Sequence, residues 1–258
     1  MKNFSSKFIF FGLFLMSIIL FAQKNDTVVI SPKNLEIKYL KEGKSRYLVY
    51  FKKDESAPIS DVQIWEIDVK KDNYNGKNVF NINQVWYHKD TIVHHAKSVS
   101  LVENFKTLYH ESWWKMRGLQ IYNVEKNELT IDGKTIDETE SNPKKLAALK
   151  SFRSSEGQYY LNWHLDLETF ELLPFKKNTT FLIPFYEFGY DKPSNIPYSI
   201  IGEEILEAYD GAKINCWILK HEEKDNVEKY WISKKTHEVL KMEQKFGKMY
   251  RYKIKIPF

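Results

Sequence analysis

The sequence contains one cysteine, Cys216, among its 258 residues. No disulfide can form within the chain, and we expect no lipoprotein anchor because no cysteine follows the apolar residues near the N-terminus. The thiol lies in "AKINCWILK", where Ile214 and Ile218 share its face of a predicted strand. We therefore interpret Cys216 as a small buried apolar group and not as a nucleophile.

A large excess of either charge is also lacking. The chain has 39 basic and 34 acidic residues and a formal charge of +5. Without residues 1–22, which carry Lys2 and Lys7 and no acidic residue, 37 basic and 34 acidic residues remain and the charge is +3. The two signs are interleaved, as in "KHEEKDNVEKY". The sequence therefore predicts no nucleic-acid partner.

The one long uncharged apolar run covers residues 8–21. It follows Lys2 and Lys7 and precedes Ala22, which is typical of a secretory signal peptide with a small residue at the cleavage site. The run is short for a bilayer-spanning helix, and a retained membrane anchor is the alternative. We predict a signal peptide over residues 1–22, an exported protein that is periplasmic or secreted and soluble, and a single mainly antiparallel β domain over residues 23–258.

Recognised catalytic motifs are lacking. The sequence has neither a glycine-rich phosphate loop nor a serine elbow. His94 and His95 are adjacent, so on a strand they point to opposite faces, and His110 has no second histidine one helical turn later. We predict no cofactor, no metal site and no enzymatic activity. An envelope hydrolase that uses His164 and Asp166, which share a face of a predicted strand, is an open alternative.

The sequence does contain a succession of half-buried strand patterns. In "DVQIWEIDVK", Trp65, Ile67 and Val69 alternate with Glu66 and Asp68. Turn dipeptides such as Asn-Gly and Asp-Gly separate these patterns at intervals that are typical of hairpins. Together they predict a mainly antiparallel sheet.

The same alternation occurs in "TLYHESWWKMRG", "NWHLDLETF" and "HEVLKMEQKF". In the second of these segments, Trp163, Leu165 and Leu167 form the apolar face, and Glu168 follows His164 and Asp166 on the other. We predict that all three segments are strands with one face in water.

Residues 141–152, "SNPKKLAALKSF", break the rhythm of strands. Asn142 is placed to cap a helix, and Pro143 suits its first turn. We predict one short helix here, near the middle of the fold.

Residues 181–204 also break the rhythm, because Pro184, Pro193 and Pro197 interrupt an aromatic segment. Proline is unsuited to a central strand, so we predict an apolar loop. Such a loop either forms a lip over an apolar cavity or packs on the core to close one end.

The C-terminal segment alternates strictly. Aromatic and aliphatic residues at 250, 252, 254, 256 and 258 alternate with Arg251, Lys253 and Lys255. This pattern resembles the last strand of an outer-membrane barrel, which is a second alternative. Few other segments hold such alternation over a membrane-spanning length, so we favour a soluble sheet whose final strand has one dry and one charged face.

Three runs carry a family resemblance: "WHLDLETFELLPFKKNTTF", "IIGEEILEAYDGAKINCWILK" and "YWISKKTHEVLKMEQKF". Residues 160–250 resemble the closing half of uncharacterised exported bacterial proteins that are similar to the lipoprotein-carrier superfamily typified by LolA and LolB. The resemblance implies an unclosed antiparallel barrel, strongly curved around an apolar cavity, with a helix or loop as cover. Such proteins would carry acyl chains or lipidated proteins without transforming them. The chain departs from the carriers in showing only one convincing helix.

The predicted fold is thus mainly β, a curved antiparallel sheet with one or a few short covering helices. Phe, Tyr and Trp make up 16% of the chain, which suits the walls of an apolar pocket or a filled core. We predict a non-enzymatic cell-envelope protein that binds a lipid or other hydrophobic ligand, with outer-membrane components as further partners. The predicted wall residues are Trp65, Trp114, Trp163, Trp217 and Trp231, and the predicted lip residues are Phe181, Phe185 and Tyr186.

Overall fold

The structure is a computed structural model that describes residues 26–208 and 210–257. The predicted signal peptide, residues 1–22, lies outside the described residues. The boundaries of the predicted domain, 23–258, stay a prediction. No helix in the described part of the chain is long and apolar enough to cross a membrane.

Within these residues the chain forms strands and short helices. The strands of the first half are β1 (Asp26–Val29), β2 (Gly43–Lys52), β3 (Ser60–Tyr74), β4 (Lys77–His88), β5 (Thr91–Leu101), β6 (Thr107–Trp114), β7 (Gly118–Asn123), β8 (Glu128–Ile131) and β9 (Lys134–Thr135). Those of the second half are β10 (Leu161–Asn162), β11 (Thr179–Tyr186), β12 (Ser194–Glu207), β13 (Lys213–Glu223), β14 (Asn226–Ser233), β15 (Val239–Phe246) and β16 (Met249–Ile256). The helices are α1 (Pro143–Ser154), α2 (Asp166–Glu171) and the 3-10 turns η1 (Ile37–Tyr39) and η2 (Trp163–Leu165).

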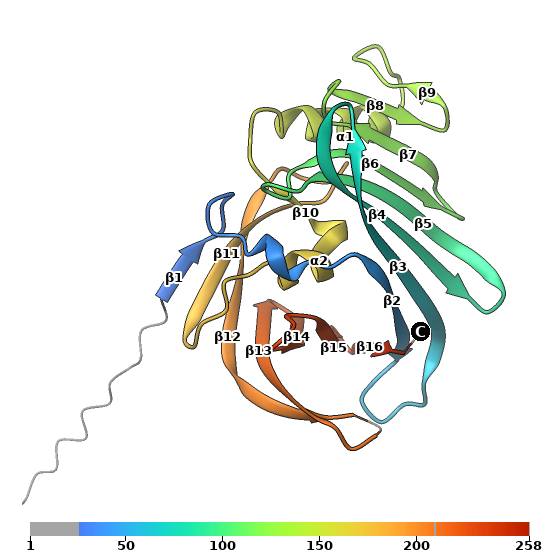
Figure 1. The fold of residues 1–258 in the computed structure, drawn as a ribbon. Coiled ribbons are helices and arrows are strands. Elements are labelled where there is room, and N and C mark those ends of the chain that lie inside the picture. The colour runs from blue at the N-terminus through green and yellow to red at the C-terminus, as the bar shows by residue number, and fades with distance from the viewer. Residues whose placement is uncertain (1–25, 209, 258) are drawn as a thin grey trace, which may run out of the picture.

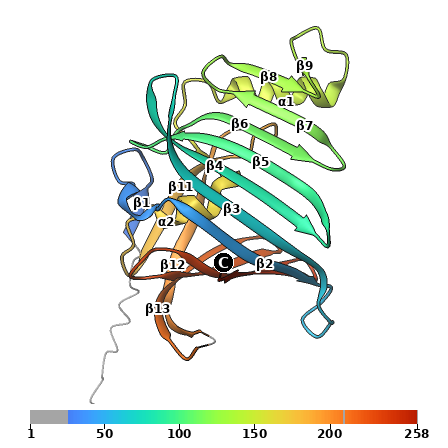
Figure 2. The same ribbon diagram turned by 45° about the vertical axis from the view of Figure 1, so that its right-hand side comes forward.

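The described strands form one 16-stranded sheet in the order β1-β11-β12-β13-β14-β15-β16-β2-β3-β4-β5-β6-β7-β8-β9, with β10 beside β11. Two antiparallel meanders, β2 to β9 and β11 to β16, are joined where β16 pairs with β2. Figure 1 shows the sheet curling around α2. Figure 2 shows that β3 to β7 follow one another with increasing distance from α2. Among the described residues no ladder joins β1 to β9, so hydrogen bonds do not close the barrel. The predicted fold class is confirmed.

The hollow of the sheet is filled mainly by α2 and the residues that follow it. Phe170, Leu172 and Leu173 have no exposed surface and belong to the largest apolar cluster. The opposing wall of the sheet contributes Trp65, Ile67, Val69, Phe80, Ile82, Phe181, Phe185, Tyr198, Tyr230 and Met242. The predicted inward face of residues 65, 67 and 69 is therefore confirmed.

Helix α1 begins where the sequence predicts it. The side chain of Asn142 accepts hydrogen bonds from the backbone N–H groups of Lys144 and Lys145, at 3.0 and 3.3 Å. Pro143 occupies the first turn, where its missing N–H is not needed. The helix buries Leu149 and Phe152 against the end of the sheet at β7 and β8.

Replacing Asn142 with alanine should lower the free energy of unfolding by about 1 kcal/mol, because two N–H groups of the first turn lose their acceptor. Urea denaturation of the two proteins measures the difference. Lys150→Ala, at an exposed position of the same helix, should change stability by less than about 0.5 kcal/mol. Equal effects of the two substitutions would show that the cap contributes nothing.

The strand predicted over residues 162–170 is wrong, because Asn162 ends the short strand β10 and residues 163–170 form η2 and most of α2. The side chain of Asn162 accepts from the backbone N–H of His164 at 3.0 Å, and that of Asp166 accepts from Leu167 at 2.8 Å. Such local hydrogen bonds favour turns and helix starts over a strand. The segment also lies inside the curved sheet, where its apolar residues contact the core on several sides. Alternation of apolar and polar residues therefore does not indicate a strand with one solvent-exposed face here.

The predicted loop at residues 181–204 is also wrong, because most of it forms β11 and β12. Pro184 falls between the segments of β11 that pair with β1, which ends opposite Leu182, and with β10, which begins opposite Phe185. Pro197 lies beyond the β12–β13 ladder, which starts at Ser199. Each proline therefore occupies a place where one side of its strand needs no backbone donor.

The charged face of β16 points inward, contrary to our expectation of a wet charged face. Lys253 pairs with Val49 and Lys255 with Tyr47, and both partners belong to the buried core. Directly opposed residues of antiparallel strands share a face, so the two lysines lie on the concave side. Lys253 is only 3% exposed. These cations line cavities of the interior.

Candidate functional site

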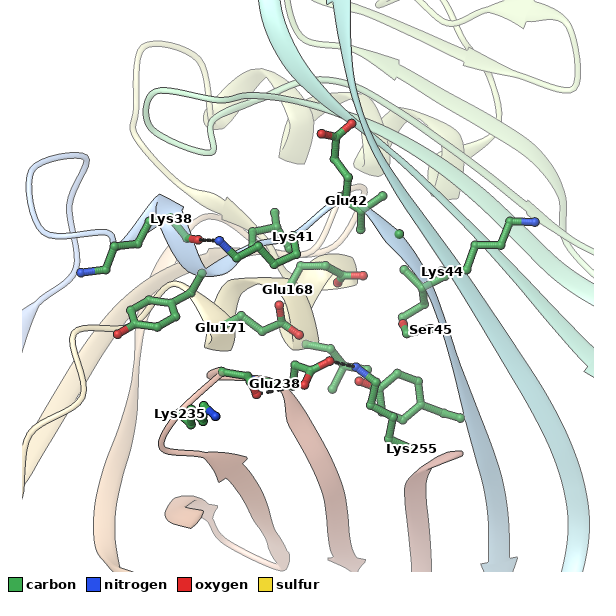
Figure 3. Close-up of a pocket in the computed structure, with 18 residues that line it drawn as sticks. Lys38, Lys41, Glu42, Lys44, Ser45, Glu168, Glu171, Lys235, Glu238 and Lys255 are labelled. Atoms are coloured by element: carbon green, nitrogen blue, oxygen red, sulfur yellow. Dashed lines mark hydrogen bonds and ion pairs between the residues drawn. The ribbon is translucent and has the colours of Figure 1, made fainter. Parts of the chain in front are cut away.

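The hollow of the sheet contains a cavity of about 560 Å³ beside α2, which we call the glutamate cavity. It lies between the segment 38–45, strands β2 and β3, helix α2 and the turn that leads into β15 (Figure 3). Its apolar wall consists of Leu40, Tyr47, Ile67, Val69 and Leu167, each at most 6% exposed. A volume of this size is within the usual range of small-molecule sites.

Three carboxyl groups point into the glutamate cavity. Glu168 and Glu171 are three residues apart on α2, which places them on one side of the helix, and Glu238 comes from the turn before β15. Figure 3 shows the three side chains converging. No sequence pattern suggests the group of three, because Glu238 belongs to a segment far from α2 in the chain.

The three carboxyls differ in their partners. Glu238 accepts from the ammonium of Lys255 at 2.6 Å and from the hydroxyl of Thr236 at 2.9 Å. Glu168 accepts from the amide of Gln84 at 3.5 Å through Oε1, whereas its Oε2 is buried without a hydrogen-bond partner in the described residues. The carboxyl of Glu171 has no hydrogen bond or ion pair within the described parts of the chain.

Burial disfavours ionisation of both carboxyls of α2. It raises the pKa of Glu168 to about 7, with a further rise from Asp166 that Lys253 and Gln84 oppose. It raises the pKa of Glu171 well above its usual value, helped by Glu168 and Glu238 and opposed by Lys255. Both carboxyls are thus hard to ionise in the ligand-free protein. A cationic group bound beside them would favour their charged form, so the cavity suits a cation.

A second cavity of about 260 Å³, the tryptophan pocket, adjoins the first, because Ile67 and Leu167 line both. It brings together three of the predicted wall residues, Trp65, Trp114 and Trp163. Its other lining residues include Gln84, Trp86, His164, Asp166, Glu187, Arg251 and Lys253. The predicted tryptophans therefore share this pocket with charged side chains that the prediction did not include.

The indole rings of the tryptophan pocket pack closely on one another. Trp65 stacks on Trp86 with ring centroids 3.6 Å apart, and Trp86 meets Trp114 edge-on at 5.3 Å. The ammonium of Lys253 lies 4.6 Å from the centre of the Trp65 ring and 3.6 Å from a carboxylate oxygen of Asp166. The ring faces are thus largely occupied by other groups of the protein, which leaves the glutamate cavity as the better candidate for an apolar ligand.

The two residues of the hydrolase alternative have different partners. Asp166 faces Lys253, whereas Nε2 of His164 lies 3.0 Å from Nε2 of His94. Nδ1 of His94 donates to the backbone oxygen of Trp113 at 2.8 Å, so its Nε2 accepts from His164. No hydrogen bond or ion pair joins His164 to Asp166 in residues 26–208 and 210–257.

His94 and His164 belong to a buried histidine cluster that also contains His110, whose ring centroid lies 5.2 Å from that of His164. Burial lowers the pKa of His94 to about 2 and that of His110 to about 3. It also lowers the pKa of His164 well below its usual value. The three rings are therefore neutral near pH 7. No group of three or more His, Cys, Asp or Glu side chains in the described chain has the geometry to hold a metal ion.

The other predicted residues line neither cavity. Trp217 stacks on Phe175 at 6.3 Å, with the ammonium of Lys234 4.2 Å from the centre of its ring. Trp231 lies on the opposite face of β14 from Tyr230, in a small cluster with Cys216 and Ile218. The interpretation of Cys216 as a buried apolar group is confirmed. The place of Trp231 on a cavity wall is corrected, because strand alternation turns it outward.

Phe181, Phe185 and Tyr186 do not form a lip. They belong to β11 and are at most 1% exposed. Phe185 packs against Phe170 and Trp163, and Tyr186 packs with the second apolar cluster beneath α1. The lip assignment is corrected because the segment is a strand whose aromatic side chains point into the core.

Comparison with protein families gives one match. The model of the family DUF3108, described as a protein of unknown function, matches residues 46–255. No curated protein matches the chain. A solved structure that resembles it is the beta-barrel-like protein of domain of unknown function DUF1849 from Brucella abortus, with a TM-score of 0.36 and 8% identity over 84% of this chain and 98% of that chain. The resemblance to LolA and LolB stays a prediction.

Proposed function

We propose that this chain, which belongs to the DUF3108 family, is a non-enzymatic binding protein that holds a hydrophobic or amphiphilic ligand in the glutamate cavity. The observation that carries the proposal is the cavity itself, about 560 Å³ with an apolar wall, inside the curved sheet. The signal peptide predicted for residues 1–22 supports a role in the cell envelope.

The cavity provides what binding of an apolar chain requires. Tyr47, Ile67 and Val69 supply one wall from the sheet, and Leu167 supplies the other from α2. Each methylene group that leaves water for such a site gains about 0.8 kcal/mol. Lys41, Lys44 and Lys235 lie on the exposed side of the cavity. A ligand would therefore meet an apolar interior behind a polar entrance.

Replacing Val69 with phenylalanine should fill part of the cavity and weaken uptake of an apolar probe such as Nile red about tenfold. Val69 pairs with Gly43 on the neighbouring strand, and a Cβ atom placed on Gly43 would have no atom within 4 Å. The space beside Gly43 can therefore accept the larger phenylalanine ring. Fluorescence titration measures the binding. Organic extracts of both purified proteins, analysed by mass spectrometry, should contain a bound lipid from the wild type and less from the variant.

The matched control is Ile205→Phe, at a residue of β12 that is 62% exposed and lines neither cavity. It adds the same apolar group without touching the cavity and should leave uptake unchanged. Thermal unfolding of both variants checks that the fold is retained. Wild-type protein that takes up no probe and yields clean extracts would exclude the proposed function.

A further inference from the structure

We propose that the ligand of the glutamate cavity carries a protonated amine, held by the carboxyl groups of Glu168 and Glu171. This inference rests on the proposed function and names the polar end of its ligand. The ligand class is an organic ammonium ion attached to an apolar chain.

The first argument is the direction of the charges. Glu168, Glu171 and Glu238 converge on the cavity, whereas Lys38 and Lys44 point away from it (Figure 3). The ammonium of Lys41 donates to the backbone oxygen of Lys38 at 2.5 Å. Lys255 faces the carboxyls, and Glu238 pairs with it at 2.6 Å. Two carboxyls of α2 therefore remain for a cation from outside.

The second argument is the unsatisfied state of Glu168. Its side chain is 3% exposed, and its Oε2 has no hydrogen-bond partner in the described residues. A buried oxygen without a donor is unfavourable, and more so when it is charged. Asp166 and Glu171 add repulsion on the same helix, and Lys253 offsets part of it from β16. An ammonium group has three donors and a positive charge, which supply what this site lacks.

Other ligand chemistries fit less well. A carboxylate or phosphate head inside the cavity would lie beside Glu168, Glu171 and Glu238, where the ammonium of Lys255 is already paired with Glu238. The other lysines that line the cavity, at positions 38, 41, 44 and 235, are at exposed positions. A bare metal ion would leave most of a 560 Å³ cavity empty, and the described residues contain no metal-binding group of three or more side chains. A neutral alcohol could donate a hydrogen bond to Oε2 of Glu168 but would not balance the negative charge of the carboxylates. The apolar wall selects a chain, and the carboxyls select its ammonium end.

The test compares octylamine, octanol and octanoate by isothermal titration calorimetry at pH 7.5, where the amine is protonated because its pKa is about 10. Octylamine should bind about tenfold more tightly than octanol, and octanoate more weakly than both. The double substitution Glu168→Gln and Glu171→Gln should bring octylamine to the affinity of octanol. Glu223→Gln, at an exposed position of β13, is the control and should change nothing.

A second readout follows the protons. A bound ammonium ion should lower the pKa of Glu168 and Glu171, so binding should release protons from the wild type near pH 7. The measured binding enthalpy should then vary with the ionisation enthalpy of the buffer. The double variant should release none. Octanol or octanoate binding as tightly as octylamine would overturn the inference and leave the proposed function standing. Failure of all three ligands to bind would overturn both.

Discussion

Replacing Phe170 with alanine is expected to lower the free energy of unfolding by about 3–5 kcal/mol. Phe170 has no exposed surface, and its ring centroid lies 4.7 Å from that of Tyr230, 4.9 Å from Tyr198 and 6.2 Å from Phe185. Helix α2 has six residues, far too few to form alone, so it depends on packing in the hollow of the sheet. The substitution removes one of the side chains that join the helix to the sheet.

Urea denaturation measures this loss, with Met116→Ala as the control. Met116 is 90% exposed, so its truncation should change stability by less than about 0.5 kcal/mol. The variant Phe170→Ala should also bind amphiphiles more weakly, since α2 carries Leu167 and both proposed binding carboxyls. A loss below about 1 kcal/mol would mean that the surrounding side chains close around the gap and that α2 needs no such anchor.

Strand alternation in the sequence separates the two faces of a strand, but it does not show which face points inward. Along β3 the alternation of Trp65, Ile67 and Val69 with charged residues identified the buried side correctly. Along β16 the alternation is equally strict, yet Lys253 is buried. A period of two divides a strand into two faces but does not say which one meets the core. That choice depends on the register of β16 with β2, a pairing between the two ends of the chain.

The errors at residues 162–170 and 181–204 have a common cause. Both segments contribute side chains to the core inside the curved sheet. Their structure therefore depends on tertiary packing more than on the local sequence pattern. In the first, Asn162 was a recognisable capping residue and could have indicated a helix start. In the second, the prolines lie where neighbouring strands begin or end, which the local sequence does not show.

The candidate site was only partly predictable. Composition indicated an aromatic interior, and three of five predicted tryptophans do meet in one pocket. The strand pattern of residues 162–170 predicts that Glu168 lies on a polar outer face. Once the segment is a helix, Glu168 and Glu171 are one turn apart, and this spacing is the signal that would have placed them together. Their juxtaposition with Glu238 needs the fold.

Replacing Glu168 with glutamine is expected to stabilise the ligand-free protein by about 3 kcal/mol at pH 7.5 and above, and hardly at all near pH 4.5. Folding raises the pKa of Glu168 from its usual 4.5 to about 7. The wild type therefore loses stability as the pH rises through this window, and the loss is complete above the folded-state pKa. Glutamine does not ionise and escapes the loss, while its amide oxygen can still accept from Gln84.

Chemical denaturation of both proteins between pH 4.5 and 8 measures the difference. The buried histidines, whose lowered pKa values make acid destabilising below about pH 6.5, contribute to both proteins and cancel in the comparison. Glu222→Gln, which removes an exposed carboxyl paired with Lys220, should show no such pH dependence. A difference that is constant with pH would mean that Glu168 ionises in the folded protein as it does in water. A difference that grows with pH would mean that the fold keeps a destabilising carboxylate at the cavity, and that a bound ammonium ion could recover the lost stability.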